Sequence, residues 1–226
     1  MTEYLKLDSA RVSLGEYWRW KPGIPFVVLA GRKVFGWRLD PTVLVPAVAK
    51  VEVVDPQSQP PELVGALAEP IHACEARGRT IELWYTVPVI GANVGLAAAL
   101  VSQDRLSVAL SAVSQARGGA YREVVLGLVS RLRNGRFLST SAGKALFNPP
   151  PEVELLRLVG RSYTELVEAH DVQMGSRRSE IEPCRDTFEL VLQLQRLQTQ
   201  ANVARGIYVP ASRHDVERVK SGEQAP

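Results

Sequence analysis

Apolar and polar residues alternate along much of the first two thirds of the chain, and the run RLSVALSAVS at 105–114 shows the pattern clearly. A period of two is typical of a strand with one buried face. The positions that would face the core are Leu106, Val108, Leu110 and Ala112. With the apolar runs 80–87 and 94–102 and a turn at Gln103-Asp104, this run predicts three successive strands.

The stretch 83–102 carries no formal charge and is long enough to cross a bilayer as a helix. Four residues would interrupt such a helix near its middle: Pro88, Gly91, Asn93 and Gly95. The N-terminal residues lack the apolar core of a signal peptide, and two distant cysteines are typical of reduced thiols. We therefore expect a soluble, cytoplasmic protein without a transmembrane segment, and a membrane span is the weaker alternative.

The segment 121–141, YREVVLGLVSRLRNGRFLSTS, predicts a β-hairpin. Asn134-Gly135 is the pair that a type I′ turn favours, because both of its central residues need a positive φ. A second hairpin is predicted over 25–39 and a short strand over 50–55.

Helical spacing first appears at 60–78, which begins with prolines and ends at a glycine. Pro70 should kink this helix or split it in two. Strand patterns stop at the proline-rich residues 148–151. Ser162 and Glu165 then form a capping box, which predicts a helix that ends near Gly175.

A longer helix is predicted from Pro183 to Gly206, because apolar residues recur there at spacings of three and four. Residues 207–210 are short and apolar, and either add an edge strand or cap the core.

These patterns predict an α+β fold with a mostly antiparallel sheet of about six to eight strands, one crossover helix and a C-terminal helical hairpin. The corresponding domains are a mostly β domain over 1–147 with one helix, a helical hairpin over 148–210 packed on it or extending from it, and a flexible tail over 211–226.

Composition supports a globular chain, with 46% hydrophobic and 23% charged residues and a net charge of +3. Basic residues outnumber acidic ones strongly within 105–144, where Glu123 is the one acidic residue. Near the hairpin tip we select Arg131, Arg133 and Arg136, together with Arg122, as candidate anion-binding residues. The alternative is a solvated strand face whose charge prevents edge-to-edge pairing.

The long C-terminal helix carries an apolar stripe with glutamines around it. An amphipathic helix of this kind can pack on its own domain or on another subunit. We select Phe188, Val191, Leu194 and Leu197 as candidate partner-interface residues, with self-association or a protein partner as the occupant.

Candidate chemistry is sparse. His72 and Cys74 could bind a metal only with distant ligands such as Cys184, His170 or Asp171, and the paired spacing of zinc fingers is missing. No G-x-S-x-G motif or phosphate-binding glycine loop is present. We assign no catalytic residue, metal ligand or cofactor, and we expect a non-enzyme.

Three functions remain open. The first is a non-catalytic interaction or scaffold protein acting through its C-terminal helix and sheet surface. The second is a binder of anionic polymers, such as nucleic acid, or of anionic lipid surfaces, through residues 105–144. The third is an enzyme whose site is assembled from scattered residues.

Overall fold

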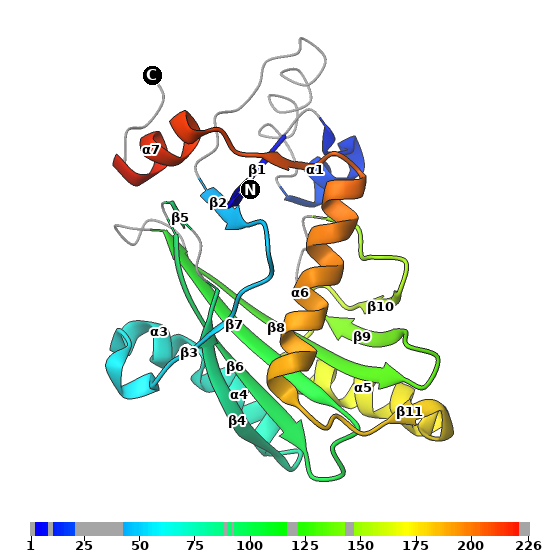
Figure 1. The fold of residues 1–226 in the computed structure, drawn as a ribbon. Helices are drawn as coiled ribbons and strands as arrows, with labels where there is room; N and C mark the ends of the chain where they lie inside the picture. Colours follow the sequence, from blue (N-terminus) through cyan, green and yellow to red (C-terminus); the bar gives the residue numbers. More distant parts are fainter. Residues whose placement is uncertain are drawn as a thin grey trace.

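The computed structural model describes residues 3–8, 11–20, 43–87, 90–91, 93–116, 122–142 and 147–221. The hairpin predicted over 25–39 lies outside these residues. Within them the chain forms two β-sheets with helices on both faces of the larger one (Figure 1). No helix in the described part is long and apolar enough to cross a membrane.

The larger sheet has the strand order β10-β9-β8-β7-β6-β4-β3, and β11 pairs with β8 beside this path. Only the β10–β9 pair in this sheet is parallel, among the described strands. The predicted α+β class and mostly antiparallel sheet are therefore confirmed. The strands are β3 (Glu52–Val53), β4 (Arg79–Thr86), β6 (Asn93–Ser102), β7 (Val108–Ala116), β8 (Arg122–Leu132), β9 (Phe137–Ser141), β10 (Val153–Arg157) and β11 (Ile181–Glu182).

A smaller sheet joins the two ends of the chain. Its order is β12-β1-β2-β5, and its strands are β12 (Tyr208–Pro210), β1 (Tyr4–Leu7), β2 (Val43–Pro46) and β5 (Ile90–Gly91). The segment after the long helix is thus an edge strand, which was one of its two predicted roles.

Three helices cover one face of the larger sheet: α3 (Pro61–Ala66), α4 (Ala68–Glu75) and α5 (Tyr163–Ser176). The predicted split of the first helix is confirmed, but it falls at Leu67 rather than at Pro70. Pro70 lies in the first turn of α4, where a missing N–H costs no helical hydrogen bond. These two helices connect β3 and β4, which are antiparallel neighbours.

The long helix α6 (Thr187–Ala204) lies on the opposite face of this sheet (Figure 1). Leu166 and Val167 of α5 pack in one core cluster, whereas Leu190 and Val191 of α6 pack in the other. The predicted pairing of α5 and α6 as a helical hairpin is therefore wrong. Each helix has a sheet face to cover, and burial against a broad apolar sheet outweighs a narrow helix–helix contact.

The sheet also continues beyond the proline-rich residues 148–151, where strand patterns were expected to stop. β10 follows directly and pairs with β9 over five residues, in parallel. Its sequence VELLR has no clean alternation because a parallel edge strand is partly covered on both faces. A division of the chain at residue 148 would cut through this sheet.

The strand predicted over 105–114 is β7, which starts at Val108, and the expectation of a single buried face was wrong. Val108 and Ala109 are both buried, and they point into different core clusters. Because β7 lies in the centre of a sheet that carries helices on both sides, its two faces are both covered. Ser111 is among the buried residues.

The β8–β9 hairpin is confirmed, but its turn is not type I′. A type I′ turn needs a positive φ at both Asn134 and Gly135. Gly135 has φ +81°, but Asn134 does not have a positive φ, because Arg105 is the only described non-glycine residue that does. The Gly135 N–H donates to the Leu132 carbonyl (2.9 Å) and the Leu132 N–H donates to the Arg136 carbonyl (2.8 Å). These bonds define a three-residue loop, in which Gly135 takes the left-handed position.

The polar C-terminal segment is ordered as helix α7 (Arg213–Ser221), so the predicted flexible tail was wrong for these residues. The Ser212 hydroxyl and N–H both donate to Asp215, which is buried and also accepts from Lys6 of β1 (2.8 Å). A capping box and one long-range ion pair hold the helix in place despite its polar composition.

Candidate functional site

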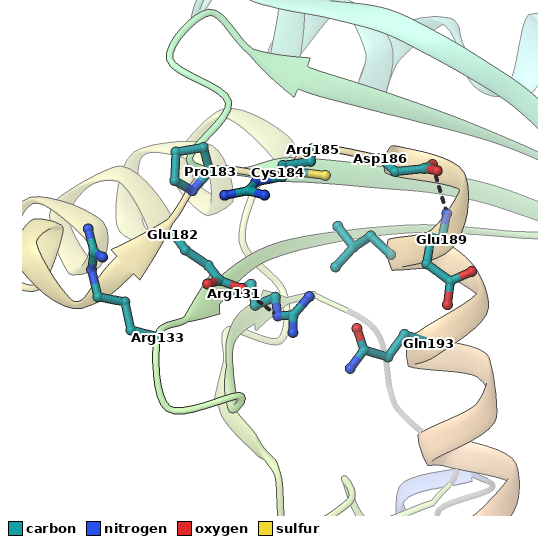
Figure 2. A pocket seen from close by; sticks show the side chains of 10 residues that line it. Arg131, Arg133, Glu182, Pro183, Cys184, Arg185, Asp186, Glu189 and Gln193 are labelled. Carbon is teal, nitrogen blue, oxygen red and sulfur yellow. Dashed lines mark hydrogen bonds and ion pairs between the residues drawn. The ribbon is translucent and has the colours of Figure 1, made fainter.

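A cavity of about 450 Å³ opens between the tip of the β8–β9 hairpin, β11 and the first turns of α6. Figure 2 shows its lining, with Arg131 and Glu182 at the centre and Gln193 toward the middle of the helix. The lining residues are Arg131, Arg133, Glu182, Pro183, Cys184, Arg185, Asp186, Glu189, Leu190 and Gln193.

β11 forms one wall of this cavity. It pairs with the end of β8, with Ile181 opposite Leu132 and Glu182 opposite Arg131. The pairing of β8 with β7 ends before this point, at Val129. Ile181 is buried against Leu132 and Leu138, which fixes the strand on the sheet. The wall is therefore attached to the hairpin by both backbone pairing and apolar packing.

The turn between β6 and β7 positions the residues that precede α6. The Cys184 N–H donates to the Arg105 carbonyl (2.8 Å), and the Arg105 Nε donates to the Cys184 carbonyl (2.6 Å). Arg105 adopts φ +58° to make this pair of contacts. A left-handed conformation at a non-glycine residue costs about 1 kcal/mol, and here it coincides with a contact that orients one side of the cavity.

The three acidic residues of the lining each have a partner. Glu182 pairs with Arg131 at 2.7 Å, and Glu189 pairs with Arg196 at 2.9 Å. The Asp186 carboxylate accepts from the Glu189 N–H at 3.0 Å and caps α6.

Two arginines of the lining have no acidic partner in the described part of the chain. Arg133 donates from Nε to the Ser179 carbonyl (3.1 Å), which leaves its charge uncompensated. Arg185 is exposed and takes part in no ion pair with a described residue. The cavity therefore combines a set of engaged carboxylates with two available guanidinium groups.

The predicted anion-binding residues do not form one cluster. Arg131 and Arg133 line the cavity, whereas Arg136 pairs with Glu154 (2.9 Å) away from it. Arg122 lies at the opposite end of β8, about 30 Å from the tip at 3.3 Å per strand residue. The structure thus brings together two of the four residues.

The predicted partner-interface residues differ in how far they are buried within their own chain. Val191 is 5% exposed and belongs to the core between α6 and the sheet. Leu194 and Leu197 are half-buried against the same core, and Phe188 is 36% exposed. The apolar stripe of α6 is thus used largely for packing within the chain.

A buried polar cluster surrounds His170 on the other face of the sheet. Its Nε2 lies 3.1 Å from the Ser130 hydroxyl, and its Nδ1 lies 3.0 Å from the Thr140 hydroxyl. Burial, and then the nearby positive charge of Arg79, lowers the pKa of His170 to about 3, so the ring is neutral. Asp171 contacts Arg79 rather than the imidazole. This arrangement differs from a catalytic triad, and its His, Ser and Thr are shielded from solvent.

The cysteines show no sign of activation. Burial raises the pKa of Cys74 to about 11 and also raises that of Cys184, so both thiols stay protonated at neutral pH. His72, two residues from Cys74, is exposed. Within the described residues, no group of three or more His, Cys, Asp or Glu side chains could hold a metal ion.

Arg185 is the cavity cation that sequence reasoning missed, and most of the other lining residues, Gln193 among them, were missed too. Arg185 directly precedes the helix cap Asp186, and a basic residue before a helix start carries no periodic signal. Its closeness to the hairpin depends on the β11–β8 pairing, which two residues of sequence could not reveal.

Comparison with protein-family models, curated proteins and solved structures finds no match for this chain.

Proposed function

We propose that this protein is a non-catalytic binder of nucleic acid, and that it holds a backbone phosphate in the cavity between the β8–β9 hairpin and α6. The observation that carries the proposal is the pair Arg133 and Arg185. Both line the cavity, and neither has an acidic partner in the described residues. Guanidinium groups present paired donors that match phosphate oxygens.

The engaged carboxylates make this cavity more favourable for an anion than its balanced formal charge suggests. Glu182 and Glu189 are held by Arg131 and Arg196, and Asp186 accepts a backbone N–H. Each acid is thus directed to a partner of its own. An incoming phosphate would meet the two remaining cations with less repulsion than three free carboxylates would cause.

The shape of the site favours a nucleic acid over a lipid surface. A cavity of about 450 Å³ lies in the range that accommodates a small group or a projecting part of a polymer. A flat membrane would make its contacts through a raised basic patch rather than through a recess.

Binding of short fluorescein-labelled oligonucleotides, single-stranded and duplex, tests the proposal by fluorescence anisotropy over a range of salt concentrations. We expect the logarithm of the affinity to fall by about 0.7–0.9 for each phosphate contact per tenfold increase in salt. Arg133→Gln and Arg185→Gln should each weaken binding severalfold. Each should also reduce the magnitude of this slope by about 0.7–0.9, the value for one phosphate contact.

Arg161→Gln is the matched control, because Arg161 is exposed at the start of α5 and pairs with Glu165. It removes the same charge on the opposite face of the sheet and should leave affinity nearly unchanged. Affinity that is insensitive to salt, or equal losses in all three variants, would contradict a specific site. Binding to phosphatidylglycerol vesicles without binding to oligonucleotides would favour the lipid alternative.

The interaction hypothesis receives less support from α6. Val191, Leu194 and Leu197 pack against the sheet of their own chain, so a partner could reach Phe188 and only the exposed parts of Leu194 and Leu197. A protein partner that uses this helix would bind mainly its polar side.

A further inference from the structure

The segment that carries Arg185 to the cavity is held by the turn between β6 and β7. The Cys184 N–H donates to the Arg105 carbonyl (2.8 Å), and the Arg105 Nε donates to the Cys184 carbonyl (2.6 Å). Arg105 itself is not among the residues that line the cavity. The turn therefore binds the residue that directly precedes Arg185 without forming a wall of the cavity.

The bond to the Cys184 carbonyl restricts the orientation of the next residue. The carbonyl of Cys184 and the N–H of Arg185 belong to one planar peptide unit. Because the bound carbonyl keeps this plane from rotating, the direction in which the Arg185 side chain leaves the backbone is restricted. The residue on the other side of Arg185 is held as well, since Asp186 caps α6 by accepting from the Glu189 N–H (3.0 Å).

The guanidinium of Arg105 extends this attachment to the first residue of α6. It also donates to Glu82 of β4 (3.1 Å), and Glu82 accepts from the Thr187 hydroxyl (3.1 Å). Thr187 is 3% exposed, so its hydroxyl is held within the core. Arg105 thus bonds to Cys184 directly and to Thr187 through Glu82, and Arg185 lies between these two points in the chain.

The backbone of Arg105 is strained. Its N–H closes a turn on the Ser102 carbonyl (2.8 Å), and it has φ +58°. Glycine or asparagine adopts this left-handed conformation at a lower cost. An arginine here bears the strain and supplies side-chain contacts to Cys184 and Glu82 that those smaller residues would not make. Strained residues of this kind cluster at functional sites.

We propose that Arg105 is a positioning residue for phosphate binding, which acts by directing Arg185 into the cavity. This inference rests on the proposed function, because Arg185 is one of the two cations assigned to the phosphate. An unrestrained Arg185 would lose conformational freedom when the ligand binds, whereas a restrained one has lost part of it beforehand. Arg105 therefore raises the affinity of the site without contacting the phosphate.

Fluorescence anisotropy with the same labelled oligonucleotides tests this inference in Arg105→Gly and Arg105→Asn. Both replacements tolerate the positive φ, so the turn is kept while the guanidinium is removed. We expect each variant to weaken binding severalfold. Because Arg185 would then contact the phosphate for only part of the time, the magnitude of the salt slope should also fall, by up to about 0.7–0.9.

A double variant separates positioning from direct contact. If Arg105 acts through Arg185, its removal has little further effect once Arg185 is replaced. Arg105→Gly combined with Arg185→Gln should therefore bind within about twofold of Arg185→Gln alone. Losses that add in the double variant would mean that Arg105 contacts the phosphate independently, and they overturn the proposal.

The matched control is Arg178→Gln. Arg178 is exposed and pairs with Asp104 of the same turn (2.9 Å). Its replacement removes one charge from this region and leaves the Arg105 contacts in place, so affinity should change little. Equal losses in Arg178→Gln and Arg105→Gly overturn the inference but not the proposed function, and so does unchanged affinity in both Arg105 variants. If the unmodified chain binds no oligonucleotide at any salt concentration, the proposed function fails and this inference fails with it.

Discussion

Arg79 is a cation with almost no access to solvent. It is 2% exposed, and its guanidinium donates to Asp171 (2.6 Å) and to the Ser107 hydroxyl (3.0 Å), while its Nε has no hydrogen-bond partner. Asp171 is more accessible, with 35% of its side chain exposed. The two members of this ion pair therefore depend on each other unequally, because only the arginine would remain buried without its partner.

This asymmetry predicts different costs for the two deletions. Asp171→Asn leaves a buried charge uncompensated and should destabilise the protein by about 3 kcal/mol. Arg79→Met removes the buried charge and leaves a carboxylate that water can reach, so its cost should be smaller. Urea unfolding of both variants measures the difference, and a larger loss for Arg79→Met would show that the packing of the arginine stem dominates.

At the scale of elements, helix α7 is attached to β1 by one ion pair, between Asp215 and Lys6. Most residues of α7 are polar, and the helix contacts β2 and β5 of the smaller sheet. Asp215 accepts from Lys6 and from the N–H and hydroxyl of Ser212, so a single carboxylate both caps the helix and attaches it to β1.

Asp215→Asn should therefore release α7 while the larger sheet stays folded. Loss of a charge-assisted contact of about 1–2 kcal/mol corresponds to a fall in amide protection of roughly five- to thirtyfold over 213–221. Hydrogen exchange with mass spectrometry resolves this segment. Glu217→Gln on the exposed side of α7 is the control, and equal loss of protection in β6–β8 would show that the helix is not an independent unit.

At the scale of the whole molecule, three buried groups make the fold sensitive to acid. His170 is neutral when folded, with a pKa of about 3 caused by burial and by Arg79. Burial would raise the pKa values of Glu16 and Asp215, but hydrogen bonds outweigh it and lower both to about 2. The donors are Arg205 and Ser13 for Glu16, and Lys6 and Ser212 for Asp215.

The unfolded chain therefore binds protons before the folded one does. The free energy of unfolding should be greatest above pH 6.5. Below that pH it should fall by about 1.4 kcal/mol per pH unit, because His170 takes up a proton only in the unfolded chain. Below about pH 4.5 it should fall more steeply, because protonation of Glu16 and Asp215 in the unfolded chain adds to the loss. Unfolding free energies between pH 7 and pH 4 test this. His170→Gln should flatten the slope above pH 4.5, whereas His72→Gln at an exposed position should not change it.

Local signals predicted the elements that depend on neighbouring residues. The Ser162–Glu165 capping box starts α5, the predicted strand 94–102 lies within β6, and Asn134-Gly135 marks a hairpin. The type of turn was wrong because a three-residue loop and a two-residue loop can share the same Asn-Gly pair. Of the three arginines that line the cavity, the sequence analysis selected Arg131 and Arg133 as anion-binding candidates and did not select Arg185.

The sequence alone determined the α+β class, most of the antiparallel strands between 79 and 141 and the start of α5 at its capping box, because these follow from periodicity and local hydrogen bonding. Only the tertiary structure decided that α5 and α6 lie on opposite faces, that β10 extends the sheet and that Arg185 lines the same cavity as Arg131 and Arg133. Those arrangements depend on which apolar surfaces pack against one another, and this packing involves contacts between residues that are far apart in the sequence.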